Sequence, residues 1–144
     1  MSTTSRQPSI LVVEDNPVDI DLMRRAFERR NLTNPLEIAR DGVEALEFLE
    51  HWERGELAPP AVILLDIKLP KVDGLEVLRR IRAHERFRRI PVVMLTSSSE
   101  DRDIATAYDC GANSYIVKPV DFGKFVEVAE QVELYWCLLN QAPG

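Results

Sequence analysis

The sequence predicts an α/β sandwich, with helices on both faces of a parallel five-stranded sheet. Short aliphatic segments alternate five times with segments of helical periodicity along the 144 residues. The segments at 9–13 and 61–65 lack the alternation of a half-exposed strand, which indicates strands buried on both faces. Parallel strands joined by right-handed helical crossovers account for both observations.

The first strand and helix meet at a sharp boundary. Residues 9–13 form the strand, and Asn16-Pro17 then supplies an N-cap and a first helical residue. Asp19 and Asp21 fall in the first turn, near the positive end of the helix dipole. The helix extends to about Arg30, and residues 36–39 form a short second strand.

The second helix begins at Asp41-Gly42 and ends at Gly55. Its apolar face is expected to comprise Val43, Leu46, Phe48 or Leu49, and Trp52. Residues 61–65 then form the third strand, which Asp66 ends.

The remaining elements continue the alternation. Asp73 and Glu76 match a capping box, and Gly111 suits the end of a helix. We expect a helix from Asp73 to about Glu85, a strand at 91–95 ending at Thr96, a helix at about 100–110, a strand at 114–117 ending at Lys118, and a helix from near Asp121 to Asn140.

Composition limits the possible functions. With 24 acidic and 18 basic residues, the net charge is −6, which argues against a nucleic-acid partner. No apolar run approaches the roughly 20 residues of a membrane span, and residues 1–8, an expected flexible N-terminus, contain no signal-peptide core. Cys110 and Cys137 form no CxxC pair, so we expect reduced thiols and a cytoplasmic protein without membrane contact.

Polar side chains gather where the strands end. Open parallel sheets bind ligands beyond the carboxyl ends of their strands. Those ends carry Glu14-Asp15, Asp66, Thr96 and Lys118, which places three carboxylates, a hydroxyl and an ammonium at one edge.

Such a cluster calls for a cation. Two carboxylates about 5 Å apart repel by roughly 3 kcal/mol at an effective dielectric constant of about 20. Oxygen ligands without histidine or cysteine suit Mg²⁺. Together, Mg²⁺ and Lys118 balance the three carboxylates and leave a site that can receive a phosphoryl group. Taken singly, Asp66 could be a cap or turn residue, and Glu14-Asp15 could simply start the first helix. Thr96 could cap the fourth helix, and Lys118-Pro119 could be no more than a strand end. Their joint placement at one edge favours a site.

From Ile10 to about Val132 the chain resembles the receiver domain of two-component response regulators. The matching segments are Val13-Glu14-Asp15-Asn16, Leu64-Leu65-Asp66-Ile67-Lys68-Leu69-Pro70 with Asp73-Gly74, Leu95-Thr96-Ser97, Gly111-Ala112 and Tyr115-Ile116-Val117-Lys118-Pro119. The resemblance implies a flavodoxin-like (βα)5 fold with strand order 2-1-3-4-5 and an extended C-terminal helix. It also implies a phosphoacceptor that assists its own phosphorylation and dephosphorylation, rather than an enzyme.

The same resemblance implies roles for the residues of the acidic cluster. Asp66 would take the phosphoryl group from a phosphohistidine of a sensor histidine kinase. Asp15, Asp66 and the backbone carbonyl of Lys68 would bind Mg²⁺, and Glu14 would act through a metal-bound water. The Lys68 side chain is a position that tunes phosphotransfer, so the phosphoryl lifetime is not predicted.

Further roles follow from the resemblance at the last two strands. Lys118 would pair with the phosphoryl group and Thr96 would hydrogen-bond it. Tyr115 would rotate inward behind Thr96 as part of a switch. Pro119 would follow a cis peptide bond that aims Lys118 into the site.

Residues beyond a minimal receiver suggest a partner. We expect a receiver at 9–132 that stands alone, followed by a helix extension and tail at 133–144. Seven of the eight residues from Val132 to Leu139 are apolar, which favours an interface, most simply a homodimer, over folding back onto the domain. The tail Tyr135-Trp136-Cys137-Leu138-Leu139-Asn140-Gln141-Ala142-Pro143 and the Leu69-Pro70-Lys71 after Asp66 resemble those of single-domain regulators paired with bacterial phytochrome kinases.

Other readings carry less support. A haloacid-dehalogenase-like phosphatase would need an acid where Lys68 stands, and a flavodoxin-like cofactor site would need a phosphate loop where Glu14-Asp15 stands. A phosphorylation-independent adaptor of receiver fold is a third alternative, against which the intact site argues. Six arginines are expected to form a solvated face rather than a docking patch: Arg79, Arg80, Arg82, Arg86, Arg88 and Arg89.

Overall fold

Five strands and five helices alternate along the part of the chain that the structure describes. This computed structural model describes residues 8–97, 101–118 and 121–140, with the backbone alone at residue 101 and at 135–140. The elements are β1 (Ile10–Val13), α1 (Pro17–Arg29), β2 (Leu36–Ala39), α2 (Gly42–Glu53), β3 (Val62–Leu65), α3 (Gly74–Ala83), β4 (Val92–Thr96), α4 (Asp101–Asp109), β5 (Ser114–Val117) and α5 (Phe122–Asn140).

All strands are parallel and lie in the order β2-β1-β3-β4-β5, which confirms the predicted topology. The three central strands are buried along their whole length, whereas β2 and β5 at the edges are mostly half-buried. Val13 pairs with both Ala39 and Leu65, and Thr96 pairs with Val117. This register brings the carboxyl ends of all five strands to one edge of the sheet.

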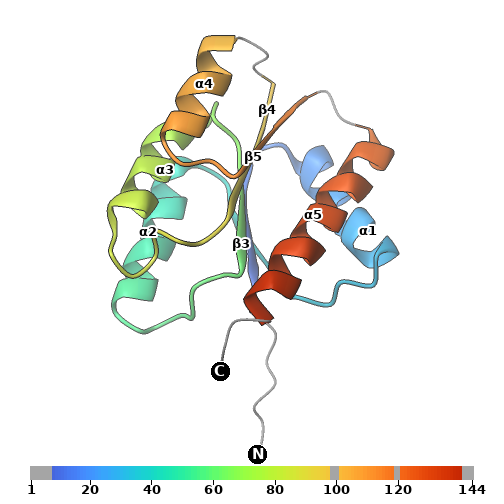
Figure 1. Cartoon of the computed structure of the whole chain (residues 1–144), viewed down its shortest axis with the longest axis horizontal. Coiled ribbons are helices and arrows are strands. Elements are labelled where there is room, and N and C mark those ends of the chain that lie inside the picture. The colour runs from blue at the N-terminus through green and yellow to red at the C-terminus, as the bar shows by residue number, and fades with distance from the viewer. Residues whose placement is uncertain (1–7, 98–100, 119–120, 141–144) are drawn as a thin grey trace, which may run out of the picture.

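Two helical layers cover the sheet, α1 and α5 on one face and α2, α3 and α4 on the other (Figure 1). Successive strand residues contribute to opposite layers, as the pleat requires. Val12, Leu64 and Leu95 pack with α1 and α5, whereas Val13, Leu65 and Met94 pack on the opposite face. The continuous apolar runs that predicted these strands are therefore shared between two separate cores.

The first turn of α2 is rotated relative to the sequence expectation. Val43 was expected inside but is 39% exposed, and Gly42 and Ala45 are buried instead. A Cβ built on Gly42 would lie 1.9 Å from the Val72 carbonyl oxygen, so only glycine fits at this buried first position of α2. The side chain of Val43, about 100° further around the helix, then faces away from the core.

Arg82, one of the six arginines predicted to be solvated, is half-buried. Its guanidinium donates to the carbonyl oxygens of Gly111 (2.9 Å), Ile90 (2.6 Å) and Arg88 (3.0 Å), and to Asn113 Oδ1 (2.9 Å). It therefore ties α3 to the segments that enter β4 and β5, and burial lowers its pKa.

The last helix runs to Asn140, as the sequence predicts. Arg30, just beyond α1, donates to Glu133 Oε1 at 2.6 Å and so fixes the C-terminal half of α5 against α1. Residues 1–7 and 141–144 lie outside the described residues. Among the helices described here, none is both long and apolar enough to cross a membrane.

Candidate functional site

Glu14 and Asp15 follow the end of β1 and differ in their exposure to solvent. Glu14 is 2% exposed, whereas Asp15 is exposed at the surface. The backbone N–H of Asn16 donates to Glu14 Oε2 at 3.1 Å, and the Asn16 side chain caps α1 by accepting from the N–H of Val18 at 2.9 Å. The cap at the start of α1 thus also holds the buried carboxylate.

Asp66 continues the β3 ladder by donating its N–H to the Val13 carbonyl at 3.1 Å. Its side chain is buried, and Oδ1 accepts from the N–H of Lys68 at 3.1 Å. The start of α3 presses against this loop, because the N–H of Gly74 donates to the Ile67 carbonyl at 2.7 Å. A Cβ at residue 74 would lie 2.0 Å from the Asp66 carbonyl oxygen, so only glycine fits.

Glu14, Asp15 and Asp66 offer a possible metal site. Each contributes one carboxylate oxygen, and these oxygens lie within 4.8 Å of one another. Donors of oxygen alone fit a hard divalent cation, and the exposed Asp15 leaves room for the waters that such an ion retains. The three predicted carboxylate ligands therefore fit Mg²⁺ or a similar ion.

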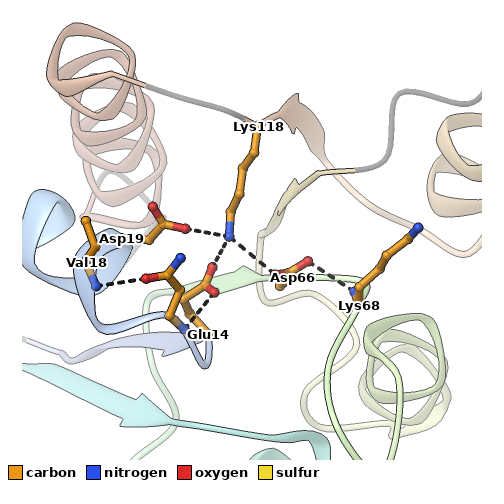
Figure 2. A network of polar contacts seen from close by, with 7 residues as sticks. Glu14, Val18, Asp19, Asp66, Lys68 and Lys118 are labelled. Atoms are coloured by element: carbon orange, nitrogen blue, oxygen red, sulfur yellow. Dashed lines mark hydrogen bonds and ion pairs between the residues drawn. The ribbon is translucent and has the colours of Figure 1, made fainter.

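Lys118 reaches into this cluster from the end of β5. Its ammonium contacts three carboxylates: Asp19 Oδ2 at 2.8 Å, Asp66 Oδ2 at 3.3 Å and Glu14 Oε1 (Figure 2). The Lys118 side chain is only 11% exposed. Its backbone N–H donates to the Thr96 carbonyl at 2.6 Å, which ties the end of β5 to the end of β4.

The charges in the cluster shift the pKa values of its members. Burial of the Lys118 ammonium acts to lower its pKa, but hydrogen bonds to Asp19 and Glu14 and the charges of Asp66 and Glu14 outweigh burial. The pKa of Lys118 therefore lies above its usual range. Burial raises the pKa of Glu14, although the hydrogen bond and charge of Lys118 partly oppose this.

Thr96 and Tyr115 lie on the neighbouring strands β4 and β5, and Thr96 ends β4 next to the backbone of Lys118. Thr96 is fully buried and shares the face of Met94, the strand residue that pairs with Tyr115. The half-buried Tyr115 packs against the core under α2, α3 and α4, and its ring centroid is 6.5 Å from that of Tyr108. The structure brings the two predicted switch residues onto neighbouring strands, and their role as a switch stays a prediction.

Two predicted features are not tested. The structure shows the backbone N–H of Lys68 bonded to Asp66, while the metal-binding role of its carbonyl stays a prediction. Pro119 and its predicted cis peptide bond lie outside the described residues.

Asp19 is the site residue that the sequence prediction missed. It was assigned to the first helical turn, where an acid at this position commonly bonds back to the N–H of the cap residue. Here Glu14 takes the N–H of Asn16, and Asp19 contacts Lys118. The alternation of side chains along the strands could have revealed this contact. Glu14, Asp66 and Lys118 each lie two residues after a strand residue of the face that α1 covers, namely Val12, Leu64 and Ile116.

The sequence of the chain is similar to that of known regulators of comparable length. It is 46% identical over 135 residues to the probable methanogenesis regulatory protein FilR2 of Methanothrix harundinacea, covering 94% of this chain and 87% of that protein. It is 36% identical over 138 residues to the response regulator Rcp1 of Synechocystis, covering 94% of both chains.

Solved structures of response regulators resemble the fold, and those of RcpA and AtBRR are described as phytochrome or bacteriophytochrome response regulators. The phosphorylated cyanobacterial regulator RcpA superposes with a TM-score of 0.80 at 36% identity, covering 91% of this chain and 94% of that one. The Mn²⁺-bound form of Rcp1 gives 0.78 at 35% identity, with coverage of 90% and 94%. The bacteriophytochrome regulator AtBRR gives 0.71 at 47% identity, with coverage of 88% and 91%.

A family model matches most of the chain. The model of the response regulator receiver domain aligns with residues 10–130, which include every strand of the sheet and each of the converging carboxylates. The chain therefore belongs to the response regulator receiver-domain family.

Proposed function

We propose that the chain is a stand-alone response regulator that accepts a phosphoryl group on Asp66 from a sensor histidine kinase. One observation carries the proposal. Glu14, Asp15 and Asp66 converge within 4.8 Å at the edge of the sheet where Lys118 also contacts Asp66. The buried nucleophile, the candidate metal ligands and the cation thus meet at a single point. Beyond assisting its own phosphorylation and dephosphorylation, the chain is proposed to have no enzymatic activity.

The transfer requires one bond to form and one to break. An Asp66 carboxylate oxygen attacks the phosphorus of the phosphohistidine, and the P–N bond breaks with its electron pair left on the imidazole. The N–H of Lys68 orients Asp66 through Oδ1, while the Lys118 ammonium contacts Oδ2. Lys118 is therefore placed to stabilise the negative charge on the phosphoryl oxygens during transfer. When bound, Mg²⁺ supplies further positive charge for those oxygens.

Output is proposed to pass through the surface beside the site. Thr96 would donate a hydrogen bond to a phosphoryl oxygen, and Tyr115 would then rotate inward behind it. The two residues already lie on adjacent strands, and Tyr115 is half-buried at the edge of its core. A changed aromatic surface at β5 would signal to a protein partner.

The kinase is proposed to be of phytochrome type. Two observations support this proposal, the identity of 36–47% to structures described as phytochrome or bacteriophytochrome response regulators and the near-complete coverage of both chains. The regulator would act in the cytoplasm without nucleic-acid or membrane partners.

Phosphorylation can be tested directly. The chain is incubated with Mg²⁺ and acetyl phosphate, and its intact mass is measured. We expect wild type and the control Asp73→Asn to gain one phosphoryl group and Asp66→Asn to gain none, because the exposed Asp73 only caps α3. An unmodified wild type, or a modified Asp66→Asn, contradicts the mechanism. An unmodified wild type also favours a phosphorylation-independent adaptor.

The C-terminal helix is proposed to form a homodimer contact. Leu134 on α5 is 61% exposed and begins the apolar segment that reaches Leu139. Light scattering at high micromolar concentration should give a dimer mass for wild type and a monomer for Leu134→Asp. A monomeric wild type, with and without phosphodonor, contradicts the dimer.

A further inference from the structure

Three carboxylates surround the ammonium of Lys118, and one of them lies outside the candidate metal site. Glu14 and Asp66 belong to the metal-binding group, whereas Asp19 comes from the first turn of α1. Figure 2 shows the Lys118 ammonium between Asp19 on one side and Asp66 on the other. The contact to Asp19, at 2.8 Å, is shorter than the contact to Asp66, at 3.3 Å.

These contacts use all the donors of the ammonium, since a lysine carries three N–H groups. A phosphoryl group on Asp66 brings further oxygens that need the same donors. Lys118 can therefore bind them only by giving up or sharing an existing contact. Among its partners, the side chain of Asp19 is the most exposed, at 15% against 8% for Asp66 and 2% for Glu14.

Water can replace Lys118 most easily at the most exposed carboxylate, so the Asp19 contact is the one that opens. Asp19 also adds a fourth negative charge close to a position that a doubly charged phosphoryl group would occupy. The competition of Asp19 for Lys118 and its additional negative charge both disfavour the phosphorylated form. Replacing Asp19 by the uncharged asparagine, which has the same size, removes the charge and weakens the competition.

On this basis, and resting on the proposed function, we propose that Asp19 is a positioning residue that competes with the phosphoryl group for Lys118. In the unmodified chain it draws the ammonium toward α1. On phosphorylation, the phosphoryl oxygens replace the Asp19 carboxylate as a partner of the Lys118 ammonium. The Asp19 carboxylate thereby weakens the interaction between Lys118 and the phosphoryl group.

The test measures binding of beryllium trifluoride, an analogue of the phosphoryl group, at saturating Mg²⁺ by titration calorimetry. Asp19→Asn is expected to bind the analogue at least about fivefold more tightly than wild type, as removal of a competing charged hydrogen bond implies. Asp19→Glu restores the competing charge and should return the affinity toward the wild-type value.

Asp21→Asn is the matched control. Asp21 also lies near the start of α1, but it is exposed and pairs with Arg25 at 3.1 Å instead of with Lys118. Losing its charge alters the helix dipole interaction without touching the site. We expect wild-type affinity for this variant, and thermal unfolding checks that all variants fold.

The possible failures are distinguishable. If wild type does not bind the analogue, the proposed function is overturned, and the role of Asp19 with it. If wild type binds but Asp19→Asn binds no more tightly, or Asp21→Asn tightens equally, only the role of Asp19 is overturned. Failure of Asp19→Glu to restore the affinity likewise rejects competition by charge.

Discussion

At the scale of single residues, the absence of a side chain at residue 74 shapes the candidate site. The backbone of Gly74 lies against the carbonyl of Asp66, and its N–H bonds to Ile67. The helix that follows β3 can therefore begin directly beneath the loop that carries Asp66. Any Cβ at residue 74 would have to displace this loop, which carries Asp66.

Gly74→Ala is accordingly expected to destabilise the fold by at least about 2 kcal/mol, because overpacking against backbone has no easy relief. Urea denaturation measures the loss. Phosphorylation by acetyl phosphate should also slow in the folded variant, since Asp66 moves. Gly123→Ala is the control, as a Cβ there meets its nearest neighbour, the Asp121 side chain, at 3.3 Å rather than at 2.0 Å. Equal effects of the two substitutions would contradict the packing argument.

Asp41 provides a pH-dependent contribution to stability. A hydrogen bond from the N–H of Glu44 lowers the pKa of Asp41, and Lys71, 3.1 Å away, lowers it further, although burial opposes both. A depressed carboxyl pKa means that the folded state favours the charged form. The stabilisation is complete above the ordinary pKa of 3.8 and is lost as the pH falls through the lower folded-state pKa.

Asp41→Asn keeps a good N-cap and removes only the charge. The variant should unfold at lower urea concentration than wild type at pH 7, and the difference should disappear in strongly acidic solution. Chemical denaturation at a series of pH values checks this. A difference that persists at low pH would show that the charge is not the cause.

At the scale of elements, Arg82 joins parts of the chain that the sheet alone leaves separate. From α3 its guanidinium reaches carbonyls in the segments that precede β4 and β5. Gly111, which has φ +103°, brings one of those carbonyls close; a Cβ there would lie 2.8 Å from Arg82 Nε. The arginine and the glycine therefore depend on each other.

Removing this tie should be costly compared with removing a neighbouring arginine. Arg82→Ala is expected to destabilise by about 2–3 kcal/mol, because partly buried carbonyls lose a charged donor. Arg80→Ala should change stability by less than about 0.5 kcal/mol, since Arg80 is exposed and, among the residues that the structure describes, pairs only with Glu76 of its own helix. Parallel urea titrations of the two variants make the comparison, which similar losses would refute.

At the scale of the whole molecule, the sequence predicts those features that follow from where the strands lie and where they end. Central strands buried on both faces were readable as apolar runs. The ends of the central strands β1 and β3 and of the edge strand β5 placed Glu14, Asp66 and Lys118 at one edge. Asp19 and Arg82 were missed for a physical reason. Their partners are set by tertiary packing, and the acceptors of Arg82 are mainly backbone carbonyls, which no side-chain pattern reveals.

Mg²⁺ is expected to stabilise the whole fold, because the proposed ligands come together only in the native state. Above its dissociation constant, each tenfold increase in Mg²⁺ should add about 1.4 kcal/mol to the free energy of unfolding. Thermal and urea melts with ionic strength matched by NaCl measure this. Asp15→Asn should weaken the response, and an equal response in that variant would exclude Asp15 as a ligand.

The contacts of Lys118 also have a consequence for how the chain folds. The lysine lies 104 residues from Glu14 and 52 from Asp66, so it is among the last parts of the domain to be synthesised. Until β5 joins the sheet, four acidic side chains at the ends of earlier elements repel one another without their lysine. A nascent or truncated chain would thus carry an electrostatic penalty at the point where the phosphoryl group is proposed to bind. The proposed phosphoacceptor site would then be completed in the same step as the sheet.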